Sequence, residues 1–296
     1  MATVVSINGE IFAETDAKIS VFDRGFLYGD SVFEVYRTYD GIPFAETEHL
    51  ERLARSAARL LIPLPVSLAR LAEEATAAHR ASGNDDSYLR VVVTRGSGPL
   101  TYDLTTAKDP TRVIIVAPVP TVPESHYRDG VSVRVMQVSR PTDDPQAAGV
   151  KASNYLANLL AVHEAKQAGA HEAIITGRGG EVLEGASSNI FVVRGGRLRT
   201  PRAEAGILAG ITRATVLEAA RTIGLPVDEE ALFPGDLYDA DEVFITSSIR
   251  EVVPVVKVDD RVIAGGRPGP VAGQLHRAYR EVVRARTEAG RSNASR

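Results

Sequence analysis

Lys151 is the residue whose type and setting most suggest chemistry, because it stands just before Ser153 and Asn154, either of which could cap the apolar helix that follows. The N–H groups at a helix start carry partial positive charge, which disfavours an ammonium and would help keep the amine neutral as a nucleophile. Such an amine suits Schiff-base chemistry. Most lysines before helices are solvated surface residues, so position alone leaves both interpretations open.

Two further stretches could complete a site for a phosphorylated heterocycle that bears an aldehyde. Glu184 precedes a Gly-Ala-Ser-Ser turn and an apolar strand, and an acid there can hold the proton of a pyridinium ring. The glycine-flanked loop 206–213 opens a helix whose free N–H groups could bind phosphate, with the Thr212 hydroxyl and the pair Ser247-Ser248 as added donors. Taken alone, Glu184 would be a surface acid before a turn, and the glycine loop would be weak evidence.

Composition argues against several other classes of function. Because the chain has no cysteine and its six histidines show no HExxH-type pairing, a metal site is not expected. The formal net charge is −4 without a long basic run, so nucleic acid is not expected as a partner. No apolar stretch approaches the ~20 residues of a membrane span, and the N-terminal residues lack the pattern of a signal peptide. We therefore expect a cytoplasmic protein without a membrane partner.

The elements that must position these residues are expected to form two domains, as is usual for 296 residues. Asn8-Gly9 and Asp40-Gly41 each predict a hairpin turn between apolar strands. A helix capped by Thr47 and a second one over 67–81 should follow, and then strands at 88–94 and 112–117. Segment 1–117 is thus predicted to be a small α+β domain.

The prolines at 118, 120 and 123 predict an interdomain linker over 118–129. A larger domain is expected over 130–296, with a polar, frayed tail from 288. Its predicted strands cover 131–138, 172–176, 189–193 and 242–246, and its predicted helices follow Lys151 and cover 211–223 and 270–286.

Two features of the first domain have two interpretations each. The segment 22–34, where two glycines interrupt aromatic and charged residues, is either a site loop or a bulged strand with a solvated Asp–Arg pair. Arg52, Arg55 and Arg59 share the polar face of the first helix and form, without further information, a solvated stripe.

From about Ile7 to Arg284 the sequence resembles the class IV aminotransferases, which are pyridoxal phosphate enzymes of fold type IV. The matching segments are Phe26 to Glu34, His49 to Leu53, Lys151 with Asn154 to Leu156, Glu184-Gly185 with Ser188-Asn189, Gly210 to Arg213, and Asp241 to Phe244. The resemblance implies pyridoxal 5'-phosphate as the cofactor. It also implies a mixed α/β fold, with a small N-terminal α/β domain and a larger C-terminal pseudo-barrel domain, and a homodimer whose active sites lie near the subunit interface.

The resemblance also implies a role for each matching position. Lys151 would be the Schiff-base lysine and catalytic base, Glu184 the partner of the ring nitrogen, and Tyr155 the residue that bonds the ring hydroxyl. The implied phosphate contacts are Arg52, Ile211, Thr212 and Ser248, and Ser188 is a further implied cofactor contact. The implied substrate residues are Tyr28, Phe33, Arg37, Arg90 and Ile249.

The motifs point to different members of the family. Tyr28, Arg37 and the run Tyr88-Leu-Arg90 resemble branched-chain transaminases, although Val35-Tyr36 stands where those enzymes usually have Gly-Ile. The pairs Ser187-Ser188 and Ser247-Ser248 resemble the D-amino acid transaminases. However, Leu100 and Tyr102 replace the arginine and histidine of the carboxylate trap in those enzymes, and Arg95-Gly-Ser-Gly98 resembles aminodeoxychorismate lyase.

The first expectation is therefore a transaminase that moves an amino group between an aliphatic, first of all branched-chain, amino acid and a 2-oxo acid such as 2-oxoglutarate. A D-amino acid or (R)-amine transaminase is the alternative, and a lyase that expels pyruvate is the second. A pyridoxal phosphate carrier without turnover is not expected, because a pure binder need not keep both Lys151 and Glu184.

Overall fold

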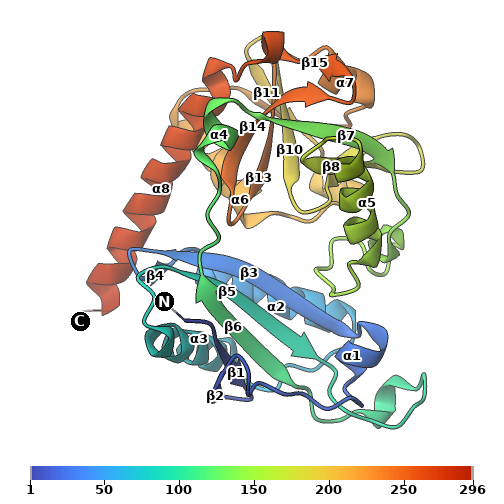
Figure 1. Cartoon of the computed structure of the whole chain (residues 1–296), viewed down its shortest axis with the longest axis vertical. Helices are drawn as coiled ribbons and strands as arrows, with labels where there is room; N and C mark the ends of the chain where they lie inside the picture. Colours follow the sequence, from blue (N-terminus) through green and yellow to red (C-terminus); the bar gives the residue numbers. More distant parts are fainter. Residues whose placement is uncertain (1, 295–296) are drawn as a thin grey trace. The chain divides into compact units, whose positions relative to one another are not determined.

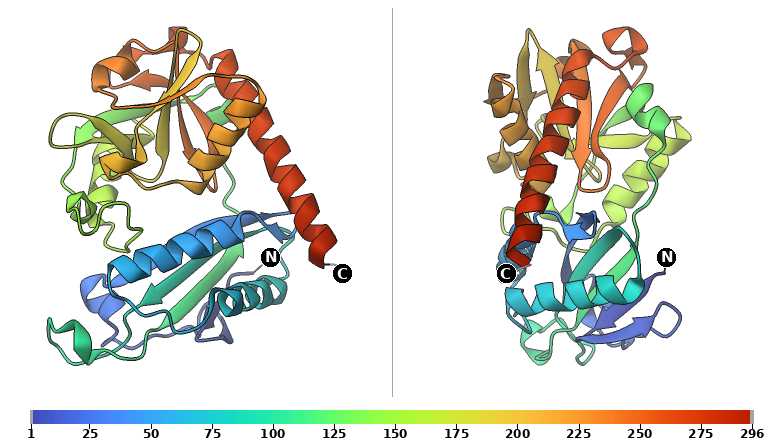
Figure 2. Two further views of the ribbon diagram at one scale, coloured as in Figure 1. Left: turned by 180° about the vertical axis from the view of Figure 1, so that it is seen from behind. Right: turned by 90° about the vertical axis from the view of Figure 1, so that its left-hand side faces the viewer.

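The computed structural model describes residues 2–294, which pack as two units (Figures 1 and 2). The first unit comprises Met1–Pro120, Val150–Asn154 and Thr287–Arg296, and the second comprises Thr121–Gly149 and Tyr155–Arg286. The segment that contains Lys151 thus packs in the first unit, although the chain on either side of it belongs to the second. This division groups residues by packing and leaves the domain limits 1–117 and 130–296 as a prediction.

The first unit is built on a six-stranded sheet in which every strand pair is antiparallel. In spatial order the strands are β2 (Glu10–Ala13), β1 (Val4–Ile7), β6 (Arg112–Pro118), β5 (Ser87–Thr94), β3 (Ser31–Tyr39) and β4 (Ile42–Pro43). Asn8 and Asp40 have positive φ angles of 52° and 49°, and each precedes a glycine whose φ is also positive. These are the backbone angles that a tight hairpin turn requires, and both predicted hairpins are confirmed.

Helices α2 (Glu46–Arg59) and α3 (Leu68–Ser82) cover one face of this sheet (Figure 2). Leu50 and Leu53 of α2, Leu71 of α3, and Leu89 and Val91 of β5 are all at most 2% exposed in one apolar cluster. Full burial of each such side chain stabilises the fold by roughly 1.5–3 kcal/mol. This core fixes the orientation of β3 and β5.

The structure agrees with the predicted start of α3 and differs from the predicted start of α2. Helix α3 begins at Leu68, close to the predicted start at 67, and Ser67 caps it, since its hydroxyl accepts a hydrogen bond from the N–H of Arg70. The predicted cap at Thr47 is wrong, because α2 already begins at Glu46 and follows Ala45, which has a φ of 53° and makes no side-chain cap bond. The short helix α1 (Arg24–Tyr28) occupies the segment that was expected to be a site loop or a bulged strand.

The second unit contains a nine-stranded mixed sheet. Its strands are, in spatial order, β12 (Val227–Glu229), β11 (Arg197–Thr200), β10 (Asn189–Arg194), β13 (Glu242–Ser247), β14 (Glu251–Val258), β7 (Val131–Gln137), β8 (Glu172–Thr176) and β9 (Val182–Gly185), and β15 (Arg261–Val262) pairs with β14. The pairs β11–β12, β14–β7 and β7–β8 are parallel, and the other pairs are antiparallel. Because β9 at the end of this order also lies beside β10, the sheet curls into half a barrel, which confirms the expected mixed α/β fold.

The helices of the second unit are α4 (Glu124–Arg128), α5 (Leu156–Gln167), α6 (Ile211–Thr222), α7 (Pro234–Tyr238) and most of α8 (Pro270–Ala294), which runs past Arg286 into the residues of the first unit. The helix α4 lies inside the predicted linker. The frayed tail expected from 288 is instead helical up to Ala294, and residues 295–296 lie outside the described part of the chain. Within residues 2–294, no helix has the length and apolar character needed to cross a membrane.

Candidate active site

Lys151 lies in an extended segment along the edge of β3, on the side away from β5. The N–H of Phe33 donates to the carbonyl oxygen of Lys151 at 3.0 Å, and the N–H of Ser153 donates to the carbonyl oxygen of Ser31 at the same distance. The N–H of Lys151 donates to the Ser56 hydroxyl of α2 at 3.2 Å, and Lys151 Nζ lies 4.5 Å from the centre of the Phe33 ring. The lysine is thus fixed by the backbone on both sides and by an aromatic ring, which attracts a cation.

The helix start expected around Lys151 is wrong in detail. Helix α5 begins at Leu156, and its N-cap is Tyr155, which makes no side-chain cap bond. Neither Ser153 nor Asn154 caps it, because the strand-like pairing of residues 151–153 with β3 holds that part of the chain in an extended form.

Arg52 is buried in an ion pair and does not belong to a solvated stripe. Its Nε and Nη2 donate to the two carboxylate oxygens of Glu34 at 2.6 and 2.7 Å, and His49 Nδ1 lies 2.7 Å from Glu34 Oε2. Burial alone would raise the pKa of Glu34, but the hydrogen bonds and charge of Arg52, with His49, lower it to about 2. Glu34 therefore stays ionised and holds the Arg52 guanidinium in a fixed plane.

Phe33, Arg37 and Arg90 lie on the face of the sheet opposite to α2 and α3. Side chains alternate along a strand, and Leu89, Val91 and other residues between these positions fill the core on the helix side. Val35, between Phe33 and Arg37 on that face, pairs with Arg90 across β3 and β5. The Arg90 guanidinium carbon lies 3.9 Å from the centre of the Phe33 ring, the ring that Lys151 Nζ also approaches. Two cations and one aromatic ring thus meet on a single sheet face.

Arg37 is engaged away from that ring. Its guanidinium carbon lies 4.3 Å from the centre of the Tyr39 ring, and its Nη2 lies 4.0 Å from Asp86 Oδ2. Of the two arginines assigned to substrate, Arg90 is therefore the one placed beside Lys151.

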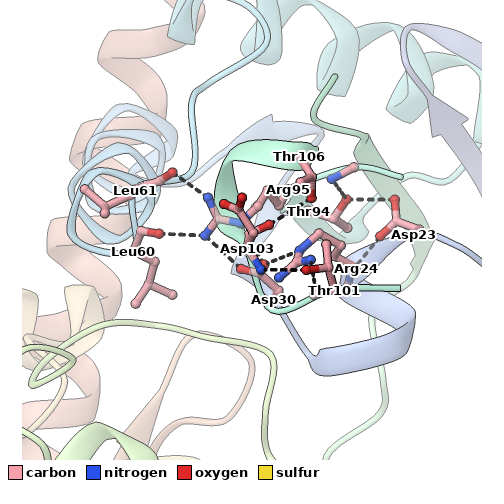
Figure 3. Close-up of polar contacts among 12 residues, drawn as sticks. Asp23, Arg24, Asp30, Leu60, Leu61, Thr94, Arg95, Thr101, Asp103 and Thr106 are labelled. Carbon is pink, nitrogen blue, oxygen red and sulfur yellow. Dashed lines mark hydrogen bonds and ion pairs between the residues drawn. The ribbon is translucent and has the colours of Figure 1, made fainter. Parts of the chain in front are cut away.

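A network of charged side chains lies at the start of β3 (Figure 3) and contacts Tyr28 through Arg24. Asp30 accepts hydrogen bonds from Arg24 Nε at 3.0 Å and from Arg95 Nε at 2.7 Å, and Arg24 Nη1 donates to the carbonyl oxygen of Thr101 at 2.7 Å. The segment's Asp–Arg pairs are therefore buried and not solvated. The Arg24 guanidinium carbon lies 4.9 Å from the Tyr28 ring centre.

Arg95 extends this network by donating to the carbonyl oxygens of Leu60 and Leu61 at the end of α2 (Figure 3). Burial would raise the pKa of Asp30, but hydrogen bonds from the two arginines, Arg95 first, lower it. Tyr102, in the loop tied down by Arg24, lies with its ring centre 5.9 Å from that of Tyr28.

Glu184 in the second unit is held by a partner that the sequence did not indicate. Arg140 Nη1 donates to Glu184 Oε1 at 2.6 Å, and the N–H of Leu208 donates to Glu184 Oε2 at 3.0 Å. Arg140 is 7% exposed and also pairs with Asp143. Because a guanidinium and a backbone N–H both favour the ionised carboxylate, Glu184 can serve as the anionic partner of a protonated ring nitrogen.

The start of α6 is open to an anion. Gly210 precedes Ile211 as the N-cap and has no side chain to bond the N–H groups of the first turn. A Cβ at Gly210 would lie 1.9 Å from Asn189 Oδ1, so any other residue there would force the Asn189 side chain to move. By contrast, both carboxylate oxygens of Glu242 accept from the first-turn N–H groups of α8. Thr212, the predicted hydroxyl donor, is buried in the first turn of α6.

The remaining predicted cofactor residues lie in two serine turns of the second unit and at the start of α5. Ser188 Oγ donates to Glu172 Oε1 at 3.0 Å, so this hydroxyl is already committed to a buried carboxylate. Ser248 and Ile249 follow β13 and are partly buried, and Tyr155 is the partly buried residue before α5.

The sequence could have indicated one of the missed residues. Glu172 is the first residue of a fully buried strand, and a buried acid must have a partner. Arg140 carries no local signal, since its role depends on a contact with Glu184, 44 positions further along the chain. Among the described residues, no group of three or more histidines or acids could hold a metal ion.

Comparisons with known proteins agree with this arrangement. Residues 31–258 match the family model for amino-transferase class IV. A Methanocaldococcus jannaschii protein provisionally named branched-chain-amino-acid aminotransferase is 40% identical over 278 residues, covering 94% of this chain and 96% of that protein. A D-alanine aminotransferase of Bacillus licheniformis is 34% identical over 285 residues, covering 96% and 98%. The crystal structure of the Escherichia coli branched-chain amino acid aminotransferase has a TM-score of 0.89 at 31% identity, covering 96% of this chain and 95% of that one.

Proposed function

We propose, since this chain belongs to the class IV aminotransferases and is therefore a pyridoxal-phosphate-dependent transaminase, that it exchanges amino groups between a branched-chain L-amino acid and 2-oxoglutarate. The observation that carries this proposal is the placement of Arg90 over Phe33, the ring that Lys151 also contacts. The partly buried Val35, which lies next to Phe33 on the same sheet face, offers an apolar surface for an aliphatic side chain. The guanidinium offers a partner for the second carboxylate of 2-oxoglutarate and of glutamate.

The residues present fit the cofactor. It needs an amine for its aldehyde, an anion for its ring nitrogen and N–H donors for its phosphate, and Lys151, Glu184 and the uncapped start of α6 are of these three kinds. The buried Thr246 hydroxyl at the end of β13 has no hydrogen-bond partner among the described residues, which suits a donor reserved for a bound anion. The expectation from the resemblance is thus compatible with the chemistry of each residue.

Each residue would contribute one task to the reaction. Pyridoxal phosphate, when bound, supplies an electron sink for the charge that develops at the α-carbon of the amino donor. We propose that Lys151 holds the cofactor aldehyde and then moves the α-proton as the general base and acid. Arg140 keeps Glu184 anionic, so that the ring nitrogen retains its proton.

The other roles are proposed on the family motifs together with the placement described above. Phosphate would be bound by Arg52, Ile211, Thr212 and Ser248, while Tyr155 would bond the ring hydroxyl and Ser188 would support the cofactor from its turn. Tyr28, Arg37 and Ile249 would contact substrate. We also propose the domain limits 1–117 and 130–296 with a linker between them, a cytoplasmic location, and a homodimer with active sites near the interface.

The second candidate is a D-amino acid transaminase, which the paired serines at 187–188 and 247–248 and the D-alanine aminotransferase relative favour. A half-reaction screen separates the candidates: each L-amino acid, D-amino acid or (R)-amine is added to the purified protein, and the visible absorption of the bound cofactor is followed. We expect L-leucine, L-isoleucine and L-valine to bleach it. Bleaching by D-alanine or an (R)-amine alone would contradict the branched-chain proposal, and pyruvate released from aminodeoxychorismate would identify a lyase.

A further inference from the structure

The partly buried Arg250 forms an ion pair with the buried Glu172 between two serine turns of the second unit. Arg250 Nη1 donates to Glu172 Oε2 at 2.5 Å, and the Glu172 side chain is 2% exposed. The first turn, Ser187-Ser188, connects β9 to β10, and the second, Ser247 to Arg250, connects β13 to β14. The pair therefore joins two turns that are far apart in sequence.

Both members of the pair bind the first turn. Glu172 Oε1 accepts hydrogen bonds from the N–H of Ser187 at 2.7 Å and from both serine hydroxyls at 3.0 Å. Arg250 Nη2 donates to the carbonyl oxygen and the hydroxyl of Ser187 at 3.1 and 2.9 Å. Gly185 makes room for this arrangement, because a Cβ there would lie 2.1 Å from Ser188 Oγ.

Arg250 also fixes its own turn. Its Nε donates to the Ser247 hydroxyl at 3.1 Å, and its carbonyl oxygen accepts from the Tyr127 hydroxyl of α4 at 3.1 Å. The next residue, Glu251, has a φ of 57°, a left-handed conformation that is costly for a residue with a side chain. Glu251 is held there by His276 and Arg280 of α8, at 2.6 and 2.8 Å. The turn before β14 is therefore clamped from β8, α4 and α8.

We propose that Arg250 is a positioning residue for the phosphate end of the cofactor, because it locks the turn that carries Ser248 against the Ser187-Ser188 turn. This inference rests on the proposed role of Ser248 as a phosphate contact. Only an arginine can do this with one side chain, since its planar fork donates to Glu172, Ser187 and Ser247 at once, whereas a lysine has a single nitrogen. The effect is pre-organisation: Ser248 does not have to be ordered when the anion binds.

The test uses the full-length protein from which the cofactor has been removed, and compares the binding of pyridoxal phosphate with that of pyridoxal, which lacks the phosphate. We expect Arg250→Met to weaken binding of pyridoxal phosphate by about 10- to 100-fold, as when orienting residues are removed around metal ligands. Binding of pyridoxal should not change. Equal binding of pyridoxal phosphate by the variant and the wild type would overturn the inference.

Because Arg250→Met leaves a buried carboxylate without its cation, two further variants separate positioning from folding. Arg250→Lys keeps the charge and should restore the melting temperature without restoring the affinity for pyridoxal phosphate. The double variant Arg250→Met with Glu172→Gln removes both charges, and it should likewise restore the melting temperature without restoring the affinity for pyridoxal phosphate. Recovery of full affinity in either variant would show that the pair acts only on stability.

Arg197→Met is the matched control, since Arg197 makes a two-pronged pair with Asp228 on the exposed β11–β12 edge, and it should leave both affinities unchanged. Ser248→Ala separates the inference from its premise. If Ser248→Ala leaves the preference for pyridoxal phosphate intact, the assignment of Ser248 fails. If Ser248→Ala lowers that preference and Arg250→Met does not, the positioning role of Arg250 fails.

Discussion

Replacing Arg90 by methionine should discriminate between substrates that carry one carboxylate and those that carry two. Under the proposed function, glutamate and 2-oxoglutarate would bring a second carboxylate to the sheet face where Phe33 and Val35 are the apolar neighbours of Arg90. A carboxylate moved from water to such a surface loses hydration, and a guanidinium is needed to offset the loss. Leucine and valine place only methyl groups there. Methionine keeps the length and apolar character of the arginine stem and removes the charge.

The size of the effect follows from the position of Arg90. Two opposite charges about 4 Å apart attract by about 1 kcal/mol in water and about 4 kcal/mol at the effective dielectric of a protein surface. Arg90 is partly buried, so we expect roughly 2 to 4 kcal/mol, with solvent screening favouring the lower end. At 1.4 kcal/mol for each factor of ten, this is a selective loss of about 30- to 700-fold in kcat/KM for glutamate and 2-oxoglutarate.

The assay measures kcat/KM for each half-reaction separately, with glutamate and leucine as donors in wild type and variant. Arg37→Met is the comparison, because Arg37 lies on the same face but is already engaged by Tyr39 and Asp86. An equal loss for glutamate and leucine in Arg90→Met would refute the reasoning and assign Arg90 to the α-carboxylate or to the fold. A selective loss in Arg37→Met instead would transfer the role to Arg37.

Three further predictions concern the reaction and the fold. Lys151→Ala should lose the visible absorption of the bound cofactor together with turnover, and a variant that kept full activity would exclude Lys151 as the central lysine. Glu184→Gln should keep the cofactor bound but slow proton transfer by one to a few orders of magnitude, ~1.4 kcal/mol per tenfold, in stopped-flow half-reactions, whereas wild-type rates would make Glu184 a structural acid. The pKa of Glu34, lowered from 4.5 to about 2, implies about 3 kcal/mol of stability that is complete above pH 4.5 and declines as the pH falls towards 2. Urea unfolding at pH 7 and pH 3 should show this loss of unfolding free energy for the wild type and a smaller loss for Glu34→Gln. If the free energy of unfolding changed equally with pH in both proteins, Glu34 would be ruled out as the cause.

Local sequence was sufficient to predict the fold wherever a few neighbouring residues determine the backbone conformation. Asn8-Gly9 and Asp40-Gly41 determine their hairpins because positive φ angles are cheap for these residues, and Ser67 caps α3 through its own hydroxyl. The apolar runs that form β8, β10 and β13 are long enough to be recognised as strands in the sequence. Short or partly polar strands such as β11 and β12 gave no such signal and exist because longer neighbours offer them hydrogen bonds.

The candidate site depends mostly on contacts that no local pattern describes. The family motifs indicated Lys151 and Glu184, but not that Arg140, which lies 44 positions before Glu184, would hold its carboxylate. Periodicity alone assigned Arg52 to a solvated stripe, whereas Glu34 on β3 draws it into the interior. The cap expected beside Lys151 failed for the same reason, since pairing with β3 competes with the helix for that backbone.

The packing of Val150–Asn154 with the first unit has a consequence for recombination between relatives. A chimera joined once, near residue 120, would take β3 and α2 from one parent and the lysine segment from the other. The hydrogen bonds from Phe33 and to Ser56, and the ring that faces Lys151 Nζ, would then be formed between sequences that were never selected together. A functional exchange of the N-terminal half therefore requires three joints, so that residues 150–154 travel with the sheet whose edge they cover.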